Sequence, residues 1–270
     1  MITAVESAQG RTFSGTPTLE VTDMTKHFGG VAALGGASLT VHPGEVVAIL
    51  GDNGAGKSTL IKCISGVHRA DSGTVAIDGV VVDVKDPQSA RGHGIETVFQ
   101  DLALFDNLRP SANFYAGREL KSPRWLGPLG VMRSKAMNDE TAKVIDRLQV
   151  SRIEPTAMIG FMSGGQRQAV ACARAFAFAS RVVILDEPTA ALGLRETANV
   201  LRLVKRLADE NVAVVLISHN LDQISEVADR ALVMRRGRVV GEVSPTPANH
   251  PQIVSLIMGS IIDSSGSAAP

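Results

Sequence analysis

The first residues in the chain that could do chemistry form a glycine-rich segment ending in a lysine and a hydroxyl residue. The segment follows the pattern G-x-x-x-x-G-K-[ST] and comprises Gly51, Asp52, Asn53, Gly54, Ala55, Gly56, Lys57 and Ser58, with Thr59 next. Glycines let backbone N–H groups approach phosphate oxygens, and a helix after them adds its positive end. Lys57 would reach the β- and γ-phosphates of a nucleotide, and the Ser58 hydroxyl would ligate Mg²⁺.

A pair of carboxylates is the second chemical feature. Asp186 and Glu187 directly follow the apolar segment 182–185, which is typical of a buried strand. Ligands bind at the carboxyl ends of parallel strands, so Asp186 is placed to hold Mg²⁺ and Glu187 to act as the base for an attacking water. A solvated acidic turn is the alternative, and the phosphate-binding pattern elsewhere in the chain favours the functional interpretation.

A third feature is the start of an alanine-rich helix, Ser163-Gly164-Gly165-Gln166. Ser163 can cap this helix, and the two glycines leave N–H groups bare, so we expect a second anion-binding helix end. A flexible loop before a helix is the alternative interpretation.

These residues need a scaffold of alternating strands and helices. Hydrophobic patterns and turn residues predict strands over 18–28, 37–42, 45–50, 96–100, 181–186 and 212–218, a hairpin over 73–84, and helices over 59–65, 135–148, 164–179 and 195–210. Strands alternating with helices imply a mostly parallel sheet. The segment from Asp101 to about Met162 is expected to be a helical insertion.

Composition excludes several classes of protein. The chain has 270 residues, a formal net charge of +0 and two cysteines. Charge balance argues against a general nucleic-acid binder, and two cysteines exclude a disulfide scaffold. No apolar run approaches the ~20 residues of a membrane-spanning helix, and Met1–Pro17 lacks the pattern of a secretory signal. Four arginines are expected to form a solvated face: Arg230, Arg235, Arg236 and Arg238.

The chain resembles the ATP-binding subunits of ABC transporters in the order of its motifs. These are the phosphate-binding segment, Gln100, residues 163–166, the acidic pair and His219. The resemblance covers about Thr18 to Gly259. It implies an α/β fold: a P-loop NTPase core of the ABC type with an antiparallel β subdomain and a helical subdomain insertion. We therefore expect a disordered tail over 1–17, a nucleotide-binding domain over 18–260 with its helical subdomain at about 101–180, and a second disordered tail over 261–270.

The resemblance also implies roles for individual residues, with ATP and Mg²⁺ as substrate and cofactor. Gln100 would sense Mg²⁺ and the attacking water, and His219 would contact the γ-phosphate. Phe28 would stack on adenine, although a core phenylalanine is a serious alternative. The family forms head-to-tail dimers, so Ser163–Gln166 would face the γ-phosphate held by a second copy of the chain.

The loop after the acidic pair departs from the family pattern, because Gly193 stands where most members have an aspartate that communicates across the dimer. The segments 51–54, 94–104 and 187–193 look most like carbohydrate importers of the ribose, xylose and fructose type, in which Gly193 is tolerated. The resemblance thus implies import of a monosaccharide, with one cassette per chain. Alternatives are import of another solute such as amino acids, a non-transport ABC ATPase, and a nucleotide-binding protein without turnover.

The expected partners are a second copy of the chain, membrane permease subunits and, indirectly, a solute-binding protein, with no nucleic acid. The expected location is the cytoplasmic face of the membrane. The segment Leu102–Ala116 is the candidate permease contact, and its apolar residues are Leu104, Phe105, Leu108, Phe114 and Tyr115. A small core within the insertion is the alternative for each of them.

Overall fold

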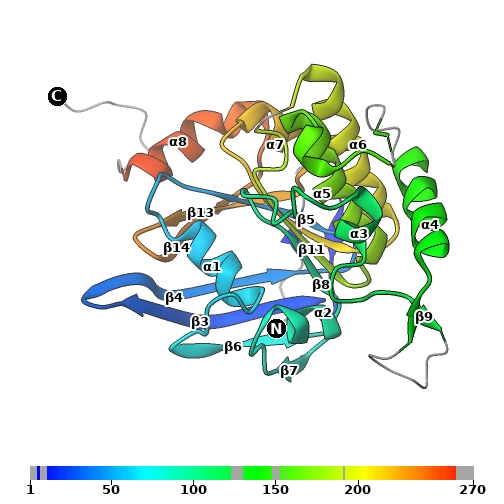
Figure 1. Ribbon diagram of the computed structural model, residues 1–270. Helices are drawn as coiled ribbons and strands as arrows, with labels where there is room; N and C mark the ends of the chain where they lie inside the picture. The colour runs from blue at the N-terminus through cyan, green and yellow to red at the C-terminus, as the bar shows by residue number, and fades with distance from the viewer. Residues whose placement is uncertain are drawn as a thin grey trace. The chain divides into compact units, whose positions relative to one another are not determined.

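The computed structural model describes residues 5–6, 11–122, 130–147, 153–154, 156–190 and 192–259 (Figure 1). Contacts divide the chain into two compact units. The first unit comprises Met1–Thr97, Ala179–Glu187 and Val204–Pro270, and the second comprises Val98–Phe178 and Pro188–Leu203. The predicted helical insertion at 101–180 falls almost entirely in the second unit.

A six-stranded sheet forms the centre of the first unit, in the order β14-β13-β5-β12-β11-β8. The strands are β5 (Val46–Leu50), β8 (Ile95–Val98), β11 (Val182–Asp186), β12 (Ala213–Ile217), β13 (Arg230–Arg235) and β14 (Arg238–Val243). β13, β5, β12 and β11 are parallel neighbours, and β14 pairs antiparallel with β13. Every residue of β5, β11 and β12 is buried, as continuous Val/Ile/Leu runs in a covered parallel sheet should be.

A second sheet of the first unit is antiparallel, in the order β4-β3-β6-β7. Its strands are β3 (Leu19–Phe28), β4 (Val31–Val41), β6 (Ser72–Ile77) and β7 (Val80–Val82). Asp78 and Gly79 connect β6 to β7, both with positive φ, which is the backbone conformation that tight hairpin turns require. The predicted hairpin over 73–84 and its turn are therefore confirmed.

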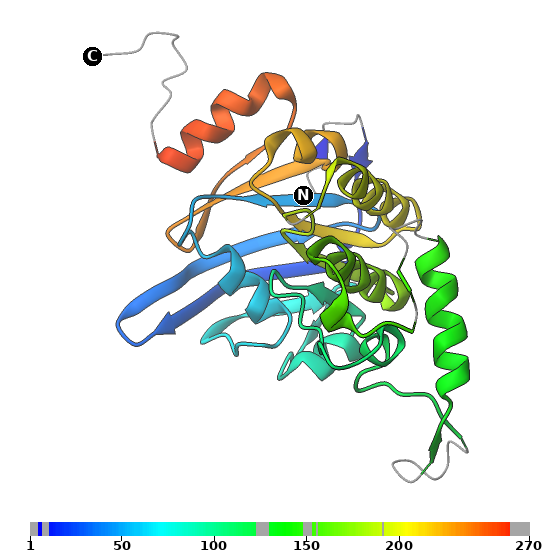
Figure 2. The ribbon, with the colours of Figure 1, turned by 45° about the horizontal axis from the view of Figure 1, so that its top comes forward.

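Helices follow several of these strands. They are α1 (Lys57–Ile64), α2 (Pro87–Gly92), α7 (Leu221–Val227), α8 (His250–Met258) and the short η3 (Pro247–Asn249), while α6 (Leu194–Asp209) begins in the second unit and ends in the first. α1 packs against β3 and β4, and α8 lies along β13 and β14 (Figure 2). Within the described part of the chain, no helix has the length and apolar character that crossing a membrane would need.

The second unit is mainly helical. Its elements are α3 (Pro110–Phe114), β9 (Lys121–Ser122), β10 (Val131–Met132), α4 (Ser134–Arg147), η2 (Ile159–Phe161) and α5 (Gly164–Phe178). Phe114 and Tyr115 lie in its hydrophobic core, with Ile159 and Val170, whereas Phe105 is 54% exposed. The proposed contact surface over 102–116 is thus wrong for Phe114 and Tyr115, because α3 turns both inward.

The start of the chain differs from the disordered tail expected over 1–17. β1 (Val5–Glu6) pairs antiparallel with β2 (Thr12–Phe13). Phe13 is buried and stacks on His42, with ring centroids 6.3 Å apart. The Arg11 guanidinium donates to the Gly44 carbonyl at 3.0 Å and pairs with Asp229 at 3.7 Å. Residues 11–13 therefore belong to the fold.

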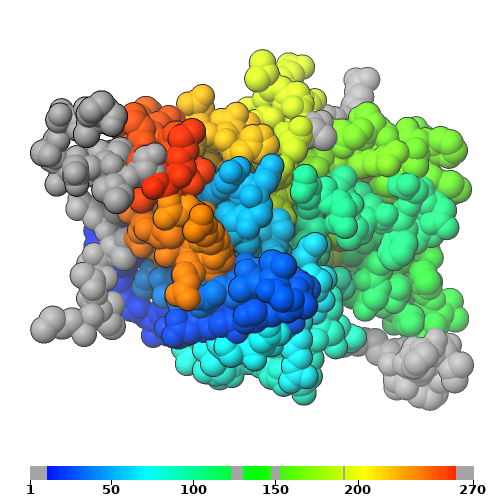
Figure 3. All heavy atoms as spheres, turned by 90° about the vertical axis from the view of Figure 1, so that its left-hand side faces the viewer, coloured from blue at the N-terminus to red at the C-terminus, as the bar shows by residue number. Residues whose placement is uncertain are grey.

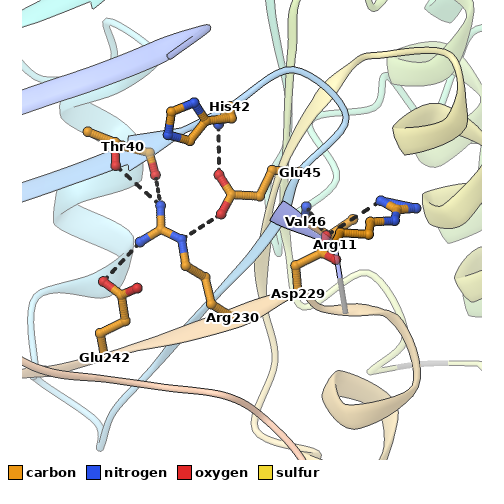
Figure 4. A network of polar contacts seen from close by, with 8 residues as sticks. All are labelled: Arg11, Thr40, His42, Glu45, Val46, Asp229, Arg230 and Glu242. Carbon is orange, nitrogen blue, oxygen red and sulfur yellow. Dashed lines mark hydrogen bonds and ion pairs between the residues drawn. The ribbon is translucent and has the colours of Figure 1, made fainter. Parts of the chain in front are cut away.

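The arginines expected on a solvated face also need a correction, because Arg230 is buried (Figure 4). Its guanidinium donates to Glu45 at 2.5 Å, to Glu242 at 3.0 Å, and to the carbonyl of Thr40. Glu45, itself fully buried, also accepts from the His42 amide at 2.7 Å. Sequence analysis did not predict the hairpin β13–β14. The contacts of Arg230 fix this hairpin to β4 through Thr40 and to Glu45, which directly precedes β5.

Candidate functional site

The glycine-rich segment connects the end of β5 to the start of α1, as the sequence predicted. Asp52, Asn53 and Gly54 are exposed. Lys57 reaches back across the segment, and its Nζ donates to the carbonyls of Gly51 at 2.8 Å and Asp52 at 2.9 Å. The segment therefore forms a closed loop that presents its backbone at the amino end of a helix, which is the arrangement an anion-binding loop needs.

The turn between β13 and β14 braces this loop, a contact that sequence analysis missed. The Gly237 amide donates to the carbonyl of Ala55 at 2.9 Å. A Cβ on Gly51 would lie 2.3 Å from the Met234 carbonyl oxygen, and one on Gly56 would lie 2.7 Å from that of Ala33. Both glycines have positive φ, so their identity is dictated by close backbone packing. Figure 3 shows these segments gathered on one face of the molecule.

The parallel sheet brings the acidic pair to the loop. β12 lies between β5 and β11, with Ile217 level with both Ile49 and Asp186. The three strands run in the same direction, so their carboxyl ends share one edge of the sheet. This edge carries the phosphate loop, the acidic pair and His219, and long-range pairing rather than sequence proximity unites them.

Asp186 is buried beside the loop and hydrogen-bonds the side chain of Ser58. Burial and, secondarily, the charge of Glu187 raise the pKa of Asp186 above its ordinary value. Burial lowers the pKa of Lys57, while Glu187 and Asp186 oppose this effect. Hard divalent cations prefer oxygen ligands. The Ser58 hydroxyl and the Asp186 carboxylate supply two such oxygens side by side, with the charge of Glu187 close to them. Ser58 and Asp186 therefore fit Mg²⁺.

Glu187 follows β11 in a strained position. Its φ is 51°, in the left-handed region that non-glycine residues seldom adopt and that clusters at functional sites. Its amide donates to the Ile217 carbonyl at 2.9 Å, and its Oε1 lies 3.2 Å from His219 Nδ1. The structure therefore orients a partly exposed carboxylate by an imidazole, which is a suitable arrangement for a general base.

Phe28 ends β3 and is 46% exposed, which excludes the core alternative. Its ring makes an edge contact with His68 at 5.2 Å between centroids, and Lys26 Nζ lies 5.6 Å from the ring centroid. A ring held this way can offer a face to a flat ligand.

The other predicted site residues belong to the second unit. Gln100 is exposed in a turn just after β8. Ser163 and Gln166 form a reciprocal cap at the start of α5, in which the Ser163 amide donates to Gln166 Oε1 at 2.9 Å and the Gln166 amide to Ser163 Oγ at 3.3 Å. The capping role predicted for Ser163 is confirmed.

The turn after Gln100 is strained and is held by α5. Leu102 and Ala103 both have positive φ. The Arg174 guanidinium donates to both of their carbonyls, at 3.2 Å and 3.0 Å. This arginine therefore connects the turn after Gln100 to α5, the helix that Ser163 caps.

Residues 34–190, more than half of the chain, match the family described as "ABC transporter". The chain belongs to this family. The matched range contains the phosphate loop, the cap of α5 and the acidic pair, while His219 lies beyond it.

Three relatives show how close the similarity is. The cassette is 42% identical to the xylose/arabinose import ATP-binding protein XylG of Sulfolobus acidocaldarius, covering 88% of this chain and 93% of that protein. It is 40% identical to the fructose import ATP-binding protein FrcA of Rhizobium meliloti, covering 90% and 94%. It is 40% identical to the ribose import ATP-binding protein RbsA 1 of Rubrobacter xylanophilus, covering 92% of this chain but 48% of that protein.

Solved structures agree with the fold. A nucleotide-free ATP-binding cassette from an ABC transporter has a TM-score of 0.74 at 26% identity, covering 89% of this chain and 98% of that one. A dimeric cassette in a post-hydrolysis state with bound ADP and Pi has a TM-score of 0.71 at 25% identity, covering 84% and 98%. The predicted ABC-type α/β fold is confirmed.

Gly193, which stands where most members of the family have an aspartate, directly precedes α6. The Gly193 carbonyl accepts from the Thr197 amide at 2.9 Å. A Cβ there would lie 2.9 Å from Glu196 Oε2. A side chain at this position would therefore require the flexible end of Glu196 to shift.

Proposed function

We propose that this cassette hydrolyses ATP to drive import of a monosaccharide through separate membrane permease subunits. The observation that carries the catalytic part is the convergence of Lys57, Asp186 and Glu187 at one edge of the parallel sheet. The cargo rests on the relatives, which are named as import proteins for xylose/arabinose, fructose and ribose. A solute-binding protein would deliver the sugar to the permease.

The residues of the loop divide the work of binding ATP. Backbone N–H groups between Gly54 and Thr59 hold the β- and γ-phosphates, and Lys57 turns its ammonium from the loop carbonyls to the γ-phosphate. Ser58 and Asp186 would hold Mg²⁺, which when bound neutralises charge that develops on the phosphates. Phe28 stacks on the adenine.

Hydrolysis then needs an activated water. The water oxygen attacks the γ-phosphorus, the bond to the ADP oxygen breaks, and Glu187 accepts the proton of the water. His219 orients Glu187 through the contact at 3.2 Å and is placed to donate to the γ-phosphate. Gln100 is assigned to contact the attacking water and Mg²⁺.

A second copy of the chain completes each site. Ser163 and Gln166 already form hydrogen bonds with one another at the start of α5. The backbone amides of the two glycines after Ser163 lie in the first turn of the helix, where the helix itself supplies no acceptors. We assign them to the γ-phosphate bound by the partner copy, so that ATP joins the two copies. Among the candidate permease contacts, Phe105 and Leu108 remain, since both are exposed.

The experiment is reconstitution of the cassette with its cognate permease and solute-binding protein in lipid vesicles. We expect release of inorganic phosphate from ATP, coupled to uptake of xylose, arabinose, ribose or fructose. Lys57→Ala should abolish both activities, and Lys85→Ala, which alters an exposed lysine paired only with Asp83 in the described contacts, should retain them. Phosphate release without uptake of any sugar would contradict the cargo assignment alone.

A further inference from the structure

The end of β3, where the chain reaches Phe28, pairs with β4 on one side and is contacted on the other by Asp71, a residue of a distant loop. Asp71 Oδ1 accepts from Lys26 Nζ at 2.8 Å. Asp71 Oδ2 accepts from the His27 amide at 2.6 Å and lies 3.0 Å from His27 Nδ1. The Asp71 amide donates to the Thr25 carbonyl at 2.9 Å. One residue thus contacts three consecutive residues immediately before Phe28.

The loop that carries Asp71 also supplies the neighbour of the Phe28 ring. Residues 65–71 connect α1 to β6, and His68, within this loop, makes the edge contact with Phe28 at 5.2 Å. The His68 amide donates to the Lys62 carbonyl on α1 at 3.0 Å. α1 begins at Lys57, so the phosphate end and the aromatic end of the site are connected through one short helix and its following loop.

Asp71 is suited to act as a permanent anchor. Hydrogen bonds from Lys26 and His27 lower its pKa to about 2, so the carboxylate remains ionised at every pH at which the protein would work. Lys26, fixed by Asp71, is also the cation near the Phe28 ring. Asp71 therefore influences the position of the Phe28 ring in two ways. It binds the backbone next to Phe28, and it holds the lysine that lies near the ring.

We propose that Asp71 is a positioning residue for the nucleobase: it fixes the end of β3 so that the Phe28 ring, flanked by His68, presents a face to adenine. The inference rests on the proposed function, in which Phe28 stacks on ATP. A merely structural surface ion pair would affect stability, but it would have no preference for ligands that carry a base.

The test compares a ligand with a base and one without. Asp71→Asn is measured by calorimetric titration with ATP·Mg²⁺ and with inorganic tripolyphosphate·Mg²⁺. Stacking on an aromatic side chain strengthens binding by about five- to 160-fold per base. A misplaced ring that keeps part of this contact should weaken ATP binding by about three- to tenfold. Affinity for tripolyphosphate should stay unchanged, and the KM for ATP should rise with little change in kcat.

Asp83→Asn is the matched control, because Asp83 is an exposed aspartate of the same unit that pairs with Lys85 at 3.4 Å. It should leave the affinities for both ligands unchanged. Lys26→Met is a second variant that removes one contact of Asp71, and it should show the same selectivity for the base if Asp71→Asn does not fold.

A double-mutant cycle with Phe28→Ala separates the possible failures. If Asp71 acts through the ring, Asp71→Asn should add nothing to the loss of ATP affinity in Phe28→Ala. Equal weakening of ATP and tripolyphosphate by Asp71→Asn, or an additive effect in the double variant, would overturn the positioning role while leaving the stacking role intact. Normal ATP affinity of Phe28→Ala would overturn the stacking assignment itself, and the inference with it.

Discussion

Two adjacent carboxylates at the end of β11 have different surroundings, and these surroundings suit the two different roles proposed for them. Asp186 is buried and hydrogen-bonded to Ser58, so it is suited to be a rigidly held ligand of a metal ion. The Glu187 side chain is 23% exposed and lies beside His219, so it can meet a water and accept a proton. Two neighbouring carboxylates thus differ in their chemical properties because they differ in burial, and burial controls the free energy of the charged form.

The role of Glu187 can be tested by a change that keeps its shape. Glu187→Gln should bind ATP normally and hydrolyse it at least about 100-fold more slowly, since general-base catalysis contributes 10²–10⁴-fold. A phosphate-release assay measures turnover, and Glu226→Gln, at a surface pair with Lys205, is the control. Wild-type turnover in Glu187→Gln would remove Glu187 from the mechanism.

A pH dependence follows from the raised pKa of Asp186. Mg²⁺ competes with a proton for this carboxylate, so Mg²⁺-dependent ATP binding should weaken as the pH falls, and should begin to do so above the ordinary aspartate value of about 4. Glu187 is one cause of the raised pKa. In Glu187→Gln the decline should therefore move to lower pH, which Mg²⁺ titrations at a series of pH values would measure. An unchanged profile would show that Glu187 does not influence Asp186.

At the scale of elements, the hairpin β13–β14 supports the site without containing any of its predicted residues. Its turn donates to the phosphate loop through Gly237, and its base is fixed by Arg230 (Figure 4). The stability of the loop should therefore depend on a buried ion pair far from it in sequence.

Arg230→Met should lower the free energy of unfolding by about 3–5 kcal/mol, because it leaves the fully buried Glu45 without its partner. Arg195→Met, an exposed arginine at the start of α6, should change stability little. Urea unfolding measures both. Replacing both members of the pair, in Arg230→Met with Glu45→Leu, should recover most of the loss, and failure to recover would show that the loss arises from packing rather than from the unpaired charge.

In the second unit, two phenylalanines nine residues apart should respond in opposite ways. Phe114→Ala should destabilise the protein by about 3–5 kcal/mol, because its side chain is 1% exposed in the core. Phe105→Ser should leave stability and the ATPase activity of the isolated cassette unchanged but reduce coupled sugar uptake with the permease. Thermal unfolding and vesicle transport measure the two effects, and normal uptake by Phe105→Ser would remove it from the permease contact.

At the scale of the whole molecule, the residues predicted to bind ATP belong to two different units. Lys57, Asp186 and Glu187 lie in the first unit, and Gln100 and Ser163 in the second. If Ser163 serves a second copy, a change at Ser163 should affect assembly but not the binding of ATP to one chain.

Ser163→Arg should therefore bind ATP with unchanged affinity but fail to dimerise. The reason is that a long side chain would occupy the place assigned to the partner's γ-phosphate. Sedimentation in the Glu187→Gln background, with and without saturating ATP·Mg²⁺, measures the association, and Ser255→Arg on α8 is the control. An ATP-dependent dimer that persists in Ser163→Arg would contradict the assignment.

Sequence alone determined the features that depend on neighbouring residues. The phosphate loop, the acidic pair, the cap at Ser163 and the buried strands follow from local spacing and composition, since a loop needs its glycines and a buried strand its apolar run. These features were sufficient to place the chain among ABC transporters.

Only the tertiary structure decided which side chains are buried and which polar groups meet. Arg230 and Glu45 are 185 positions apart, so no local pattern marks the arginine as buried. Phe114 and Phe105 look alike in the sequence, but Phe114 is buried at the end of α3 whereas Phe105 precedes this helix and is exposed. The anchoring of the Phe28 strand end by Asp71 depends likewise on a sheet register, because pairing between distant strands sets which residues touch.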